Sequence, residues 1–363
     1  MRAAIISFGG HAYYPHLLIQ AALEQLDEAV AFVPEMQRAE YQAIIGPQKG
    51  IFFYPRPRLR NPGNIKVLGK LFQSIKDFKP EVIHLLAYYP WLVFFRKQLQ
   101  EYPLVLTVHD PKKHTGDFSS KIVPGSERMF YKYASQIITL GEQMKNAIVQ
   151  SAAVEEYRIS VIPHGNLSCY LRWAASDISE EENSILFFGR LYSYKGVEYL
   201  IEAAPRILEA VPSARFIIAG NGNPAYVRKI KKLISGKSHF VFHHSFISDA
   251  MAARLFQQAS LLVLPYIDAS QSGPLLMAYA FRKPVLATRV GSLPEYVDDG
   301  RTGFIVPPKD PISLADKIIE LLQNPKLRTS MGNAGYQKSE QDFSWSTIGK
   351  KTVEVYQKAI SGT

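Results

Sequence analysis

The chain has 363 residues, of which 47% are hydrophobic, 12% aromatic and 20% charged, and its formal net charge is +10. These proportions are typical of a globular protein and exclude a disordered or collagen-like chain. The length favours two domains of about 150–200 residues each over a single core.

Short strand-like runs alternate with helix-like segments along the whole chain. In the first half, strands are expected at residues 3–7, 28–33, 50–53, 82–86, 104–109, 136–139 and 159–162, and helices at 16–25, 66–76, 89–100 and 142–152. In the second half, strands are expected at 184–188, 214–219, 239–242, 261–264, 285–288 and 302–306, and helices at 196–210, 223–234, 247–258, 274–280 and 311–323. This alternation predicts an α/β fold with parallel sheets. The polar segment 174–183 is the best candidate for a linker.

Cysteine content and apolar runs bear on where the protein resides. One cysteine, Cys169, cannot form an intramolecular disulfide, and no zinc-ligand spacing of Cys and His is present. The longest apolar runs are far shorter than the about 20 residues of a membrane-spanning helix. The N-terminus also lacks the apolar stretch of a signal peptide. We therefore expect a soluble protein of the cytoplasm.

Several common catalytic signatures are missing from the sequence. No GxGxxG follows the first strand, and no P-loop, HExxH or GxSxG motif occurs. The sequence therefore gives no support for hydride transfer, P-loop hydrolysis, zinc proteolysis or the commonest serine hydrolase mechanism. What remains is a set of loops at strand ends that carry glycine next to cations.

The strongest of these loops is FGRLYSYKG at residues 188–196. Arg190 leaves the end of an apolar strand, and Lys195 stands at the entrance of the next helix. A helix N-terminus favours anions, and the two cations add charge-assisted hydrogen bonds. The pattern indicates a diphosphate site, and the alternative is a solvated turn with ordinary surface cations. A second loop, SQSGP at residues 270–274, also lies between a strand and a helix and would offer backbone N–H groups.

A basic stretch runs from Lys49 to Lys79 and contains a single acid, Asp77. Within it, apolar residues at spacings of three and four suggest a helix face: Leu68, Leu71, Phe72 and Ile75. This face could lie on an anionic bilayer. The alternative is that the stripe is ordinary core and the cations are solvated on the opposite side. Nucleic acid is not expected as a partner, because no recognised binding module accompanies the charge.

Four segments in the second half resemble the retaining GT-B glycosyltransferases, particularly glycosyltransferase family four. They are FFGRLYSYKGVEYLIEAAP (187–205), FIIAGNG (216–222), LPYIDASQSGPLLMAYAFRKPVLAT (264–288) and RVGSLPEYVDDGRTGFIVPPKD (289–310). The first half is similar more faintly, through Gly9-Gly10 after the first strand and the run TVHD at 107–110. The resemblance implies two Rossmann-like domains facing across a cleft. Residues 1–165 would bind the acceptor and 166–345 the donor, with a C-terminal helix at 346–363 packing back on the first domain.

The resemblance also implies metal-independent transfer, without a cofactor and with retention at the anomeric carbon. It implies that Arg190 and Lys195 stabilise the departing diphosphate. His109, at a strand end, would lie beside the donor sugar, where its imidazole can hydrogen-bond a hydroxyl or accept a proton. Its alternative is a packing residue or a helix cap. The residues expected to contact the donor are Gly9, Gly10, Gly189, Asn221, Gly222, Phe246, Ile247, Asp268, Gln271, Ser272, Gly273 and Pro274.

One departure from the family concerns two glutamates, spaced eight apart, that many members carry. Their positions fall on Ala269 and Met277, and Asp268 lies next to the first. The second glutamate usually holds the ribose, so ribose recognition here must come from other residues.

We expect transfer of a sugar from a nucleoside diphosphate donor, UDP in the commoner family pattern, to a saccharide or lipid-linked saccharide acceptor. This would serve polysaccharide or glycoconjugate synthesis, with peripheral contact to an acidic membrane. A nucleotide-sugar epimerase or a phosphorylase on the same plan is a related alternative. The non-enzymatic alternative is a nucleotide-sugar-binding protein or partner subunit, supported only by the two substituted glutamate positions.

Overall fold

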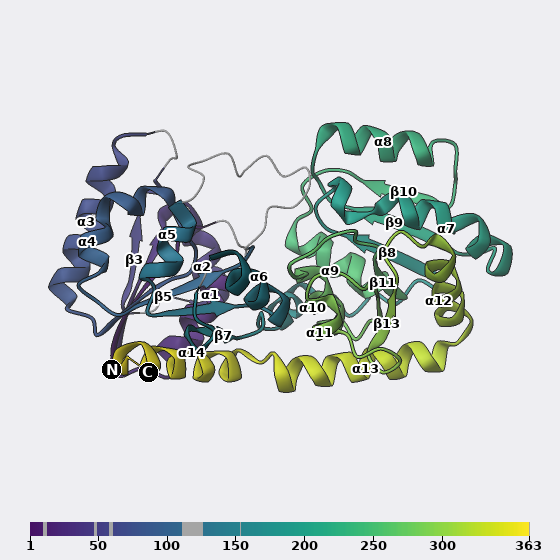
Figure 1. The fold of residues 1–363 in the computed structure, drawn as a ribbon. Helices are drawn as coiled ribbons and strands as arrows, with labels where there is room; N and C mark the ends of the chain where they lie inside the picture. Colours follow the sequence, from purple (N-terminus) through teal and green to yellow (C-terminus); the bar gives the residue numbers. More distant parts are fainter. Residues whose placement is uncertain (10–12, 47–48, 58–60, 111–125, 153, 363) are drawn as a thin grey trace. The chain divides into compact units, whose positions relative to one another are not determined.

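The chain forms two compact α/β units in a computed structural model, which describes all residues except 10–12, 47–48, 58–60, 111–125, 153 and 363 (Figure 1). Among the described residues, the first unit comprises those up to residue 110, those within 126–165 and residues 343–362. The second unit comprises residues 166–342. The C-terminal helix thus belongs to the first unit.

The first unit is built on a parallel sheet with the strand order β3-β2-β1-β4-β5-β6-β7. The strands are β1 (Arg2–Ile6), β2 (Glu28–Pro34), β3 (Ile51–Tyr54), β4 (Val82–Leu85), β5 (Leu104–Val108), β6 (Gln136–Thr139) and β7 (Ile159–Val161). The helices are α1 (Tyr14–Leu23), α2 (Arg38–Ile45), α3 (Asn64–Phe78), α4 (Arg96–Leu99), α5 (Ser126–Tyr133), α6 (Glu142–Ala152) and α14 (Trp345–Ser361), with 3₁₀ turns η1 (Glu35–Gln37), η2 (Pro90–Phe95) and η4 (Glu156–Arg158). The strand order reverses between β1 and β4, which is where such sheets bind ligands.

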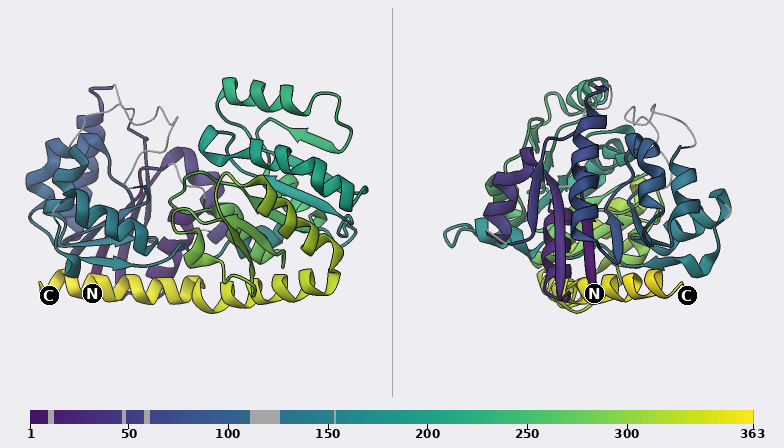
Figure 2. Two further views of the ribbon diagram at one scale, coloured as in Figure 1. Left: turned by 45° about the vertical axis from the view of Figure 1, so that its right-hand side comes forward. Right: turned by 90° about the vertical axis from the view of Figure 1, so that its left-hand side faces the viewer.

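Alternating side chains of the first sheet enter two apolar cores. Along β1, Ala4 and Ile6 belong to one core, which also contains the buried face of α3, and Ala3 and Ile5 belong to the other. This is the period of two that a strand buried on both faces requires. The second core includes α1 and α14, so the helix nearest the C-terminus completes the unit that begins at residue 1 (Figure 2).

A buried polar chain ties α14 to the first sheet. His84 of β4 lies 2.7 Å from the Tyr356 hydroxyl through Nδ1 and 2.7 Å from Thr107 Oγ1 through Nε2. The close approach of α14 to α1 requires glycine at position 349, where a Cβ would lie 2.6 Å from the Ala21 carbonyl oxygen. Burial lowers the pKa of His84 to about 3, so the imidazole is neutral at physiological pH.

The basic stretch of the first unit corrects one expectation. Leu68, Leu71, Phe72 and Ile75 on α3 are all buried in the core, so this stripe is not available to a bilayer. The alternative interpretation, an ordinary core stripe, describes α3. Lys66, Lys70 and Lys76 are exposed on the same helix, whereas Arg58 and Arg60 lie outside the described residues.

The second unit has a parallel sheet with the strand order β10-β9-β8-β11-β12-β13. The strands are β8 (Ser184–Phe188), β9 (Arg215–Ala219), β10 (Phe240–His243), β11 (Leu261–Leu264), β12 (Val285–Thr288) and β13 (Gly303–Val306). The helices are α7 (Val197–Ala210), α8 (Pro224–Ile234), α9 (Asp249–Gln258), α10 (Gly273–Ala280), α11 (Leu293–Tyr296), α12 (Pro311–Gln323) and α13 (Pro325–Asp342), with 3₁₀ turns η5 (Ser168–Trp173) and η6 (Ser193–Lys195). The prediction of α/β units with parallel sheets is confirmed. Here the strand order reverses between β8 and β11.

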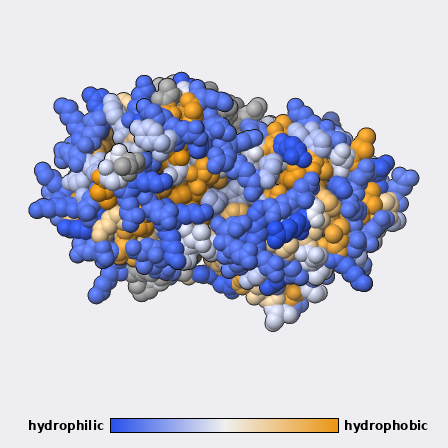
Figure 3. Space-filling model, turned by 60° about the horizontal axis from the view of Figure 1, so that its bottom comes forward, coloured by the Kyte–Doolittle hydropathy of each residue, from blue (hydrophilic) through white to orange (hydrophobic). Residues whose placement is uncertain are grey.

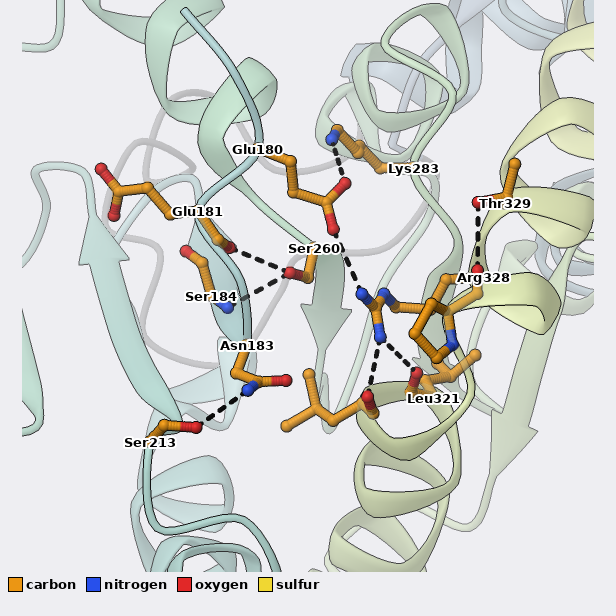
Figure 4. Close-up of polar contacts among 12 residues, drawn as sticks. Glu180, Glu181, Asn183, Ser184, Ser213, Ser260, Lys283, Leu321, Arg328 and Thr329 are labelled. Atoms are coloured by element: carbon orange, nitrogen blue, oxygen red, sulfur yellow. Dashed lines mark hydrogen bonds and ion pairs between the residues drawn. The ribbon is translucent and has the colours of Figure 1, made fainter.

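The polar segment 174–183 is not a linker, because it lies inside the second unit. Figure 4 shows how it is held: Glu180 accepts hydrogen bonds from Lys283 Nζ at 2.8 Å and from Arg328 Nη2 at 3.5 Å. The Arg328 guanidinium also donates to the carbonyls of Leu321 and Leu322 at the end of α12. The polar residue Glu180 in the segment 174–183 thus forms ion pairs within the second unit, and the segment is not a flexible connection.

The surface is mainly hydrophilic in the view of Figure 3, where hydrophobic side chains gather in several separate patches. Within the described residues, no helix combines the length and apolar character needed to cross a bilayer.

Candidate active site

Two loops of the second unit, which follow β8 and β9, meet through their backbones at the carboxyl edge of the sheet. Gly189 follows β8, and its N–H donates to the Ala219 carbonyl at 3.0 Å. A Cβ at Gly220 would overlap the Gly189 carbonyl oxygen, and both glycines have positive φ. The Leu191 N–H donates to the Asn221 carbonyl at 2.9 Å. Gly189, Asn221 and the adjoining Gly222 are therefore brought together on one glycine-lined surface.

The two predicted cations lie on the loop between β8 and α7, on either side of Tyr194. Lys195 is only 8% exposed, and its ammonium lies 3.5 Å from the centroid of the Tyr266 ring and 5.0 Å from that of Tyr194. Arg190 is exposed, and its Nη2 donates to the Tyr194 hydroxyl at 3.0 Å. An ammonium over aromatic faces is attracted by their negative quadrupole, and more strongly where water is excluded. The aromatic rings thus fix a largely buried positive charge at this edge of the sheet.

The loop after β11 is bonded to the turn that carries Lys195. The Ile267 N–H donates to the Tyr194 carbonyl at 2.8 Å. Gly196 has φ 61°, and a Cβ there would overlap the Pro265 carbonyl oxygen. Only glycine fits both the left-handed backbone and this close approach. The cation loop and the β11 loop therefore form one rigid assembly.

The second predicted loop provides the start of α10 beside this assembly. Ser272 is the N-cap residue, Gly273 begins the helix and Pro274 occupies its first turn. The first N–H groups of a helix have no partner within the helix, so this end presents donors to an anion. The Tyr266 hydroxyl lies 3.3 Å from Ser272 Oγ, which links the helix start to the ring beneath Lys195.

The positions usually held by glutamates are apolar and buried here. Ala269 and Met277 are 6% and 3% exposed. Neither side chain carries an oxygen that could bind a ligand. Asp268 is half-buried, with its N–H 3.3 Å from the Tyr194 carbonyl. Gln271 carries a buried Oε1 that has no hydrogen-bond partner among the described residues. A buried acceptor left unsatisfied costs about 1–3 kcal/mol, so this amide oxygen is a candidate to accept a hydrogen bond from a ligand.

The loop after β10 holds the two remaining predicted residues of this unit. Phe246 is 87% exposed and Ile247 is half-buried. Ser248, which follows, caps α9 by accepting a hydrogen bond from the Met251 N–H at 3.3 Å. β10 pairs with β9 and β9 with β8, so this loop lies on the same carboxyl edge as the cations.

The first unit carries its predicted residues at the carboxyl edge of its own sheet. Gly9 follows β1 with φ 78°, and its N–H lies 3.2 Å from Ser7 Oγ. His109 follows β5, is buried, and donates from Nε2 to the Leu86 carbonyl beyond β4 at 2.9 Å. Its ring meets Tyr14 edge-on, with the centroids 4.8 Å apart. These contacts fix the ring plane of His109 at the carboxyl edge of the sheet, beside the end of β4.

The remaining predicted residue of the first unit, Gly10, lies outside the described residues. His164 packs against Tyr14 and Trp345 within the first unit, at centroid distances of 4.9 and 6.0 Å, so it is an interior residue.

Sequence reasoning missed the polar contacts that support the start of α7. The Tyr226 hydroxyl accepts a hydrogen bond from the Val197 N–H at 3.0 Å and donates to the buried Glu198 carboxylate. Lys229 lies 3.0 Å from the same carboxylate. Tyr194 and Tyr266, which enclose Lys195, were also missed. Tyr194 and Tyr266 are far apart in the sequence, so no periodic pattern connects them. Only the run YSYK at 192–195 places Tyr194 next to Lys195.

Comparison with known proteins assigns the class. A family model described as "Glycosyltransferase Family 4" matches residues 8–165, and one described as "Glycosyl transferases group 1" matches residues 182–324. An uncharacterized glycosyltransferase, MJ1607, from Methanocaldococcus jannaschii is 28% identical over 78% of this chain and 76% of its own length. The glycogen synthase of Mycobacterium tuberculosis is 27% identical over 79% of this chain and 71% of its own length.

Two solved structures share the fold across the chain. Anabaena Alr3699/HepE in complex with UDP and glucose gives a TM-score of 0.75 at 18% identity, covering 99% of this chain and all of its own. Sucrose-phosphate synthase from Thermosynechococcus elongatus gives 0.76 at 19% identity, covering 100% of both chains. The protein is a glycosyltransferase with the GT-B fold, and it belongs to glycosyltransferase family four, as its motifs predicted.

Proposed function

We propose that this glycosyltransferase uses a UDP-sugar as donor and transfers the sugar with retention to a saccharide or lipid-linked saccharide, without a metal ion. The observation that carries the proposal is the pair Arg190 and Lys195 at the reversal of strand order, next to the start of α10. A diphosphate between them would meet two cations and the free N–H groups of a helix N-terminus.

The chemistry of the step makes these cations catalytic. When the glycosidic bond to the donor breaks, negative charge develops on the terminal phosphate oxygens. Lys195 is already desolvated between two rings, so it stabilises that charge without reorganising at the moment of reaction. Within the described residues, no group of three or more His, Cys, Asp and Glu has the arrangement of a metal site. Arg190 and Lys195 would therefore neutralise the charge of the diphosphate.

The remaining donor contacts are proposed for residues on the same edge. Gln271 would accept a hydrogen bond from a ribose hydroxyl, in place of the glutamate that Met277 replaces. The loop with Phe246 and Ile247 would hold the base, and the glycine surface at Gly189 and Gly222 would lie along the diphosphate. In the first unit, Gly9 and His109 are proposed to contribute to binding of the donor sugar. Because Nε2 of His109 is the donor to Leu86, Nδ1 of the neutral ring is the atom suited to a sugar hydroxyl.

We also propose that the protein acts in the cytoplasm, at the surface of an acidic membrane. The buried stripe of α3 takes no part in this contact. Support comes instead from large apolar side chains that the first unit exposes next to lysines, such as Phe52 and Ile65 near Lys66. A cation near an anionic surface contributes about 1 kcal/mol, so several together give weak, salt-sensitive binding.

The decisive experiment mixes the purified protein with a panel of nucleotide sugars and measures nucleoside diphosphate release, with and without acceptors. We expect release from a UDP-sugar, and we expect UDP to raise the melting temperature by binding the native state. The non-enzymatic alternative, a nucleotide-sugar-binding protein or partner subunit, draws support from Ala269 and Met277. Tight UDP binding without release from any donor would favour that alternative over catalysis.

A further inference from the structure

An apolar groove runs along the open edge of the first unit's sheet. It lies between the edge strand β3 and helix α3, and its volume is about 410 Å³. Its walls include Phe32, Phe52, Val67 and Leu71. The Phe52 ring stacks on Phe32 with centroids 5.6 Å apart, yet it remains 51% exposed. The groove therefore leaves aromatic surface in water that a hydrocarbon would cover.

Two lysines stand on the same groove. Lys66 and Lys70 both line it, one helical turn apart on α3, and both are exposed. Neither forms an ion pair with an acid among the residues that the structure describes. Two ammonium groups at this spacing form a point of attraction for a phosphate group. The groove thus joins apolar walls to a site for an anion.

A larger and more polar pocket adjoins the groove. It has a volume of about 910 Å³ and shares Pro55 and Val67 with the groove. Its other walls include Arg56, Asn61 and Tyr89, which follow strands β3 and β4 at the carboxyl edge of the sheet. An aromatic ring with amide and guanidinium groups suits a polar, hydroxyl-rich ligand. His109 lies at the same edge of the sheet, beyond β5.

Resting on the proposed function, we infer that the acceptor is an amphiphile, a hydrocarbon chain joined through phosphate to a saccharide. The chain would lie on Phe52 in the groove between β3 and α3, the phosphate would meet Lys66 and Lys70, and the saccharide would enter the adjoining pocket. A free saccharide would leave the apolar walls uncovered, and a neutral lipid would leave both ammonium groups unpaired. The acceptor class that uses all three features is an anionic lipid-linked saccharide.

The test uses farnesyl phosphate as a soluble probe, at concentrations where it forms no micelles, in titration calorimetry with the full chain. We expect binding of farnesyl phosphate, and binding at least tenfold weaker for farnesol and for inorganic phosphate. Lys66→Gln/Lys70→Gln should weaken farnesyl phosphate binding at least tenfold. The matched control Lys76→Gln/Lys97→Gln removes the same net charge at exposed sites outside the groove and should leave binding unchanged.

A second variant tests the groove without altering charge. Ser74 is exposed and lines the groove, so Ser74→Trp should fill it and weaken farnesyl phosphate binding with both lysines intact. UDP-induced thermal stabilisation and release of UDP from the donor report on the donor site and should be unchanged in every variant. This keeps a failure of the acceptor inference distinct from a failure of the proposed function.

Three results would overturn the inference. One is equally weak binding of farnesyl phosphate, farnesol and inorganic phosphate by a protein that still binds UDP. Another is an equal loss of farnesyl phosphate affinity in Lys66→Gln/Lys70→Gln and in the control Lys76→Gln/Lys97→Gln. That result would show that binding depends on the overall charge of the protein rather than on this groove. The third is binding only to acidic vesicles and never to the monomeric probe, which would indicate a membrane surface contact instead. Loss of UDP binding by the unaltered protein would refute the proposed function itself.

Discussion

Replacing Lys195 tests the role of the largely buried cation most directly. In Lys195→Met the unbranched apolar stem is kept and only the ammonium is removed. The ammonium lies 3.5 Å from the Tyr266 centroid, where a cation–aromatic contact contributes about 2 kcal/mol when desolvated. Removing the charge also relieves its desolvation, so the two effects on stability oppose each other. We therefore expect the free energy of unfolding to fall by less than about 2 kcal/mol.

The effect on turnover should be much larger. Losing one preorganised contact to a developing oxyanion costs about 2.7–4 kcal/mol of barrier, which is about 10²–10³ in kcat. Nucleotide release at saturating donor measures kcat, and urea unfolding measures stability. Lys231→Met, at an exposed position on α8, serves as the control and should behave as the unaltered protein. A folded Lys195→Met protein with kcat within tenfold of the unaltered protein would refute the assignment of Lys195 to the leaving group.

Four further results are expected. Arg190→Ala should lower kcat at least tenfold without loss of structure, because the guanidinium is exposed and its hydrogen bond to the Tyr194 hydroxyl stays within one loop; normal turnover would contradict its role. Activity should persist in EDTA, since the cations supply the charge that a metal would; a strict requirement for Mg²⁺ or Mn²⁺ would contradict this. Burial lowers the pKa of His84 to about 3 and that of His16 to about 4. Below pH 6.5 these two histidines are protonated in the unfolded chain but stay neutral in the native protein. The free energy of unfolding should therefore fall with decreasing pH, by up to about 1.4 kcal/mol per pH unit for each histidine. Urea unfolding between pH 7 and pH 5 measures this slope, and a flat profile would show that the native rings are protonated. Glu180→Gln should lower stability by about 1–3 kcal/mol, because Lys283 and Arg328 lose their charged partner; an unchanged urea midpoint would mean that the ion pairs contribute nothing.

The strands were predictable because their apolar runs are short and bounded by polar or glycine residues. Residues 184–188, 261–264 and 285–288 were expected as strands and are β8, β11 and β12. Helix α13 was missed because its buried residues include Gly332, Gly335 and Ser339, so no apolar stripe marks its inner face. Residues 89–100 were expected as one helix but form the 3₁₀ turn η2 and the short α4. The β-branched Val93 and the aromatic residues Trp91, Phe94 and Phe95 have a lower helix propensity, which weakens a regular α-helix there.

The site was predictable in part for a similar reason. The glycines and cations of residues 189–196 stand together in the sequence, so a local pattern carries them. The rings around Lys195 come from distant positions, since Tyr266 meets it only because β11 lies next to β8 in the sheet. The groove between β3 and α3 is also a product of folding. Sequence reasoning recognised its lysines but left open whether the apolar stripe of α3 meets the core or a membrane, because periodicity does not say which partner an apolar face meets.

The position of α14 has a consequence for how the protein is made. Residues 345–361 contribute Ile348, Val355 and Tyr356 to a core that otherwise consists of residues from the first half of the chain. During synthesis, the first unit must wait with that core open while residues 166–342 are translated, which takes on the order of 10–35 s at 5–20 residues per second. The described residues of the second unit, 166–342, are continuous in sequence and precede α14. The first unit can therefore close this core only after residues 345–361 have been synthesised.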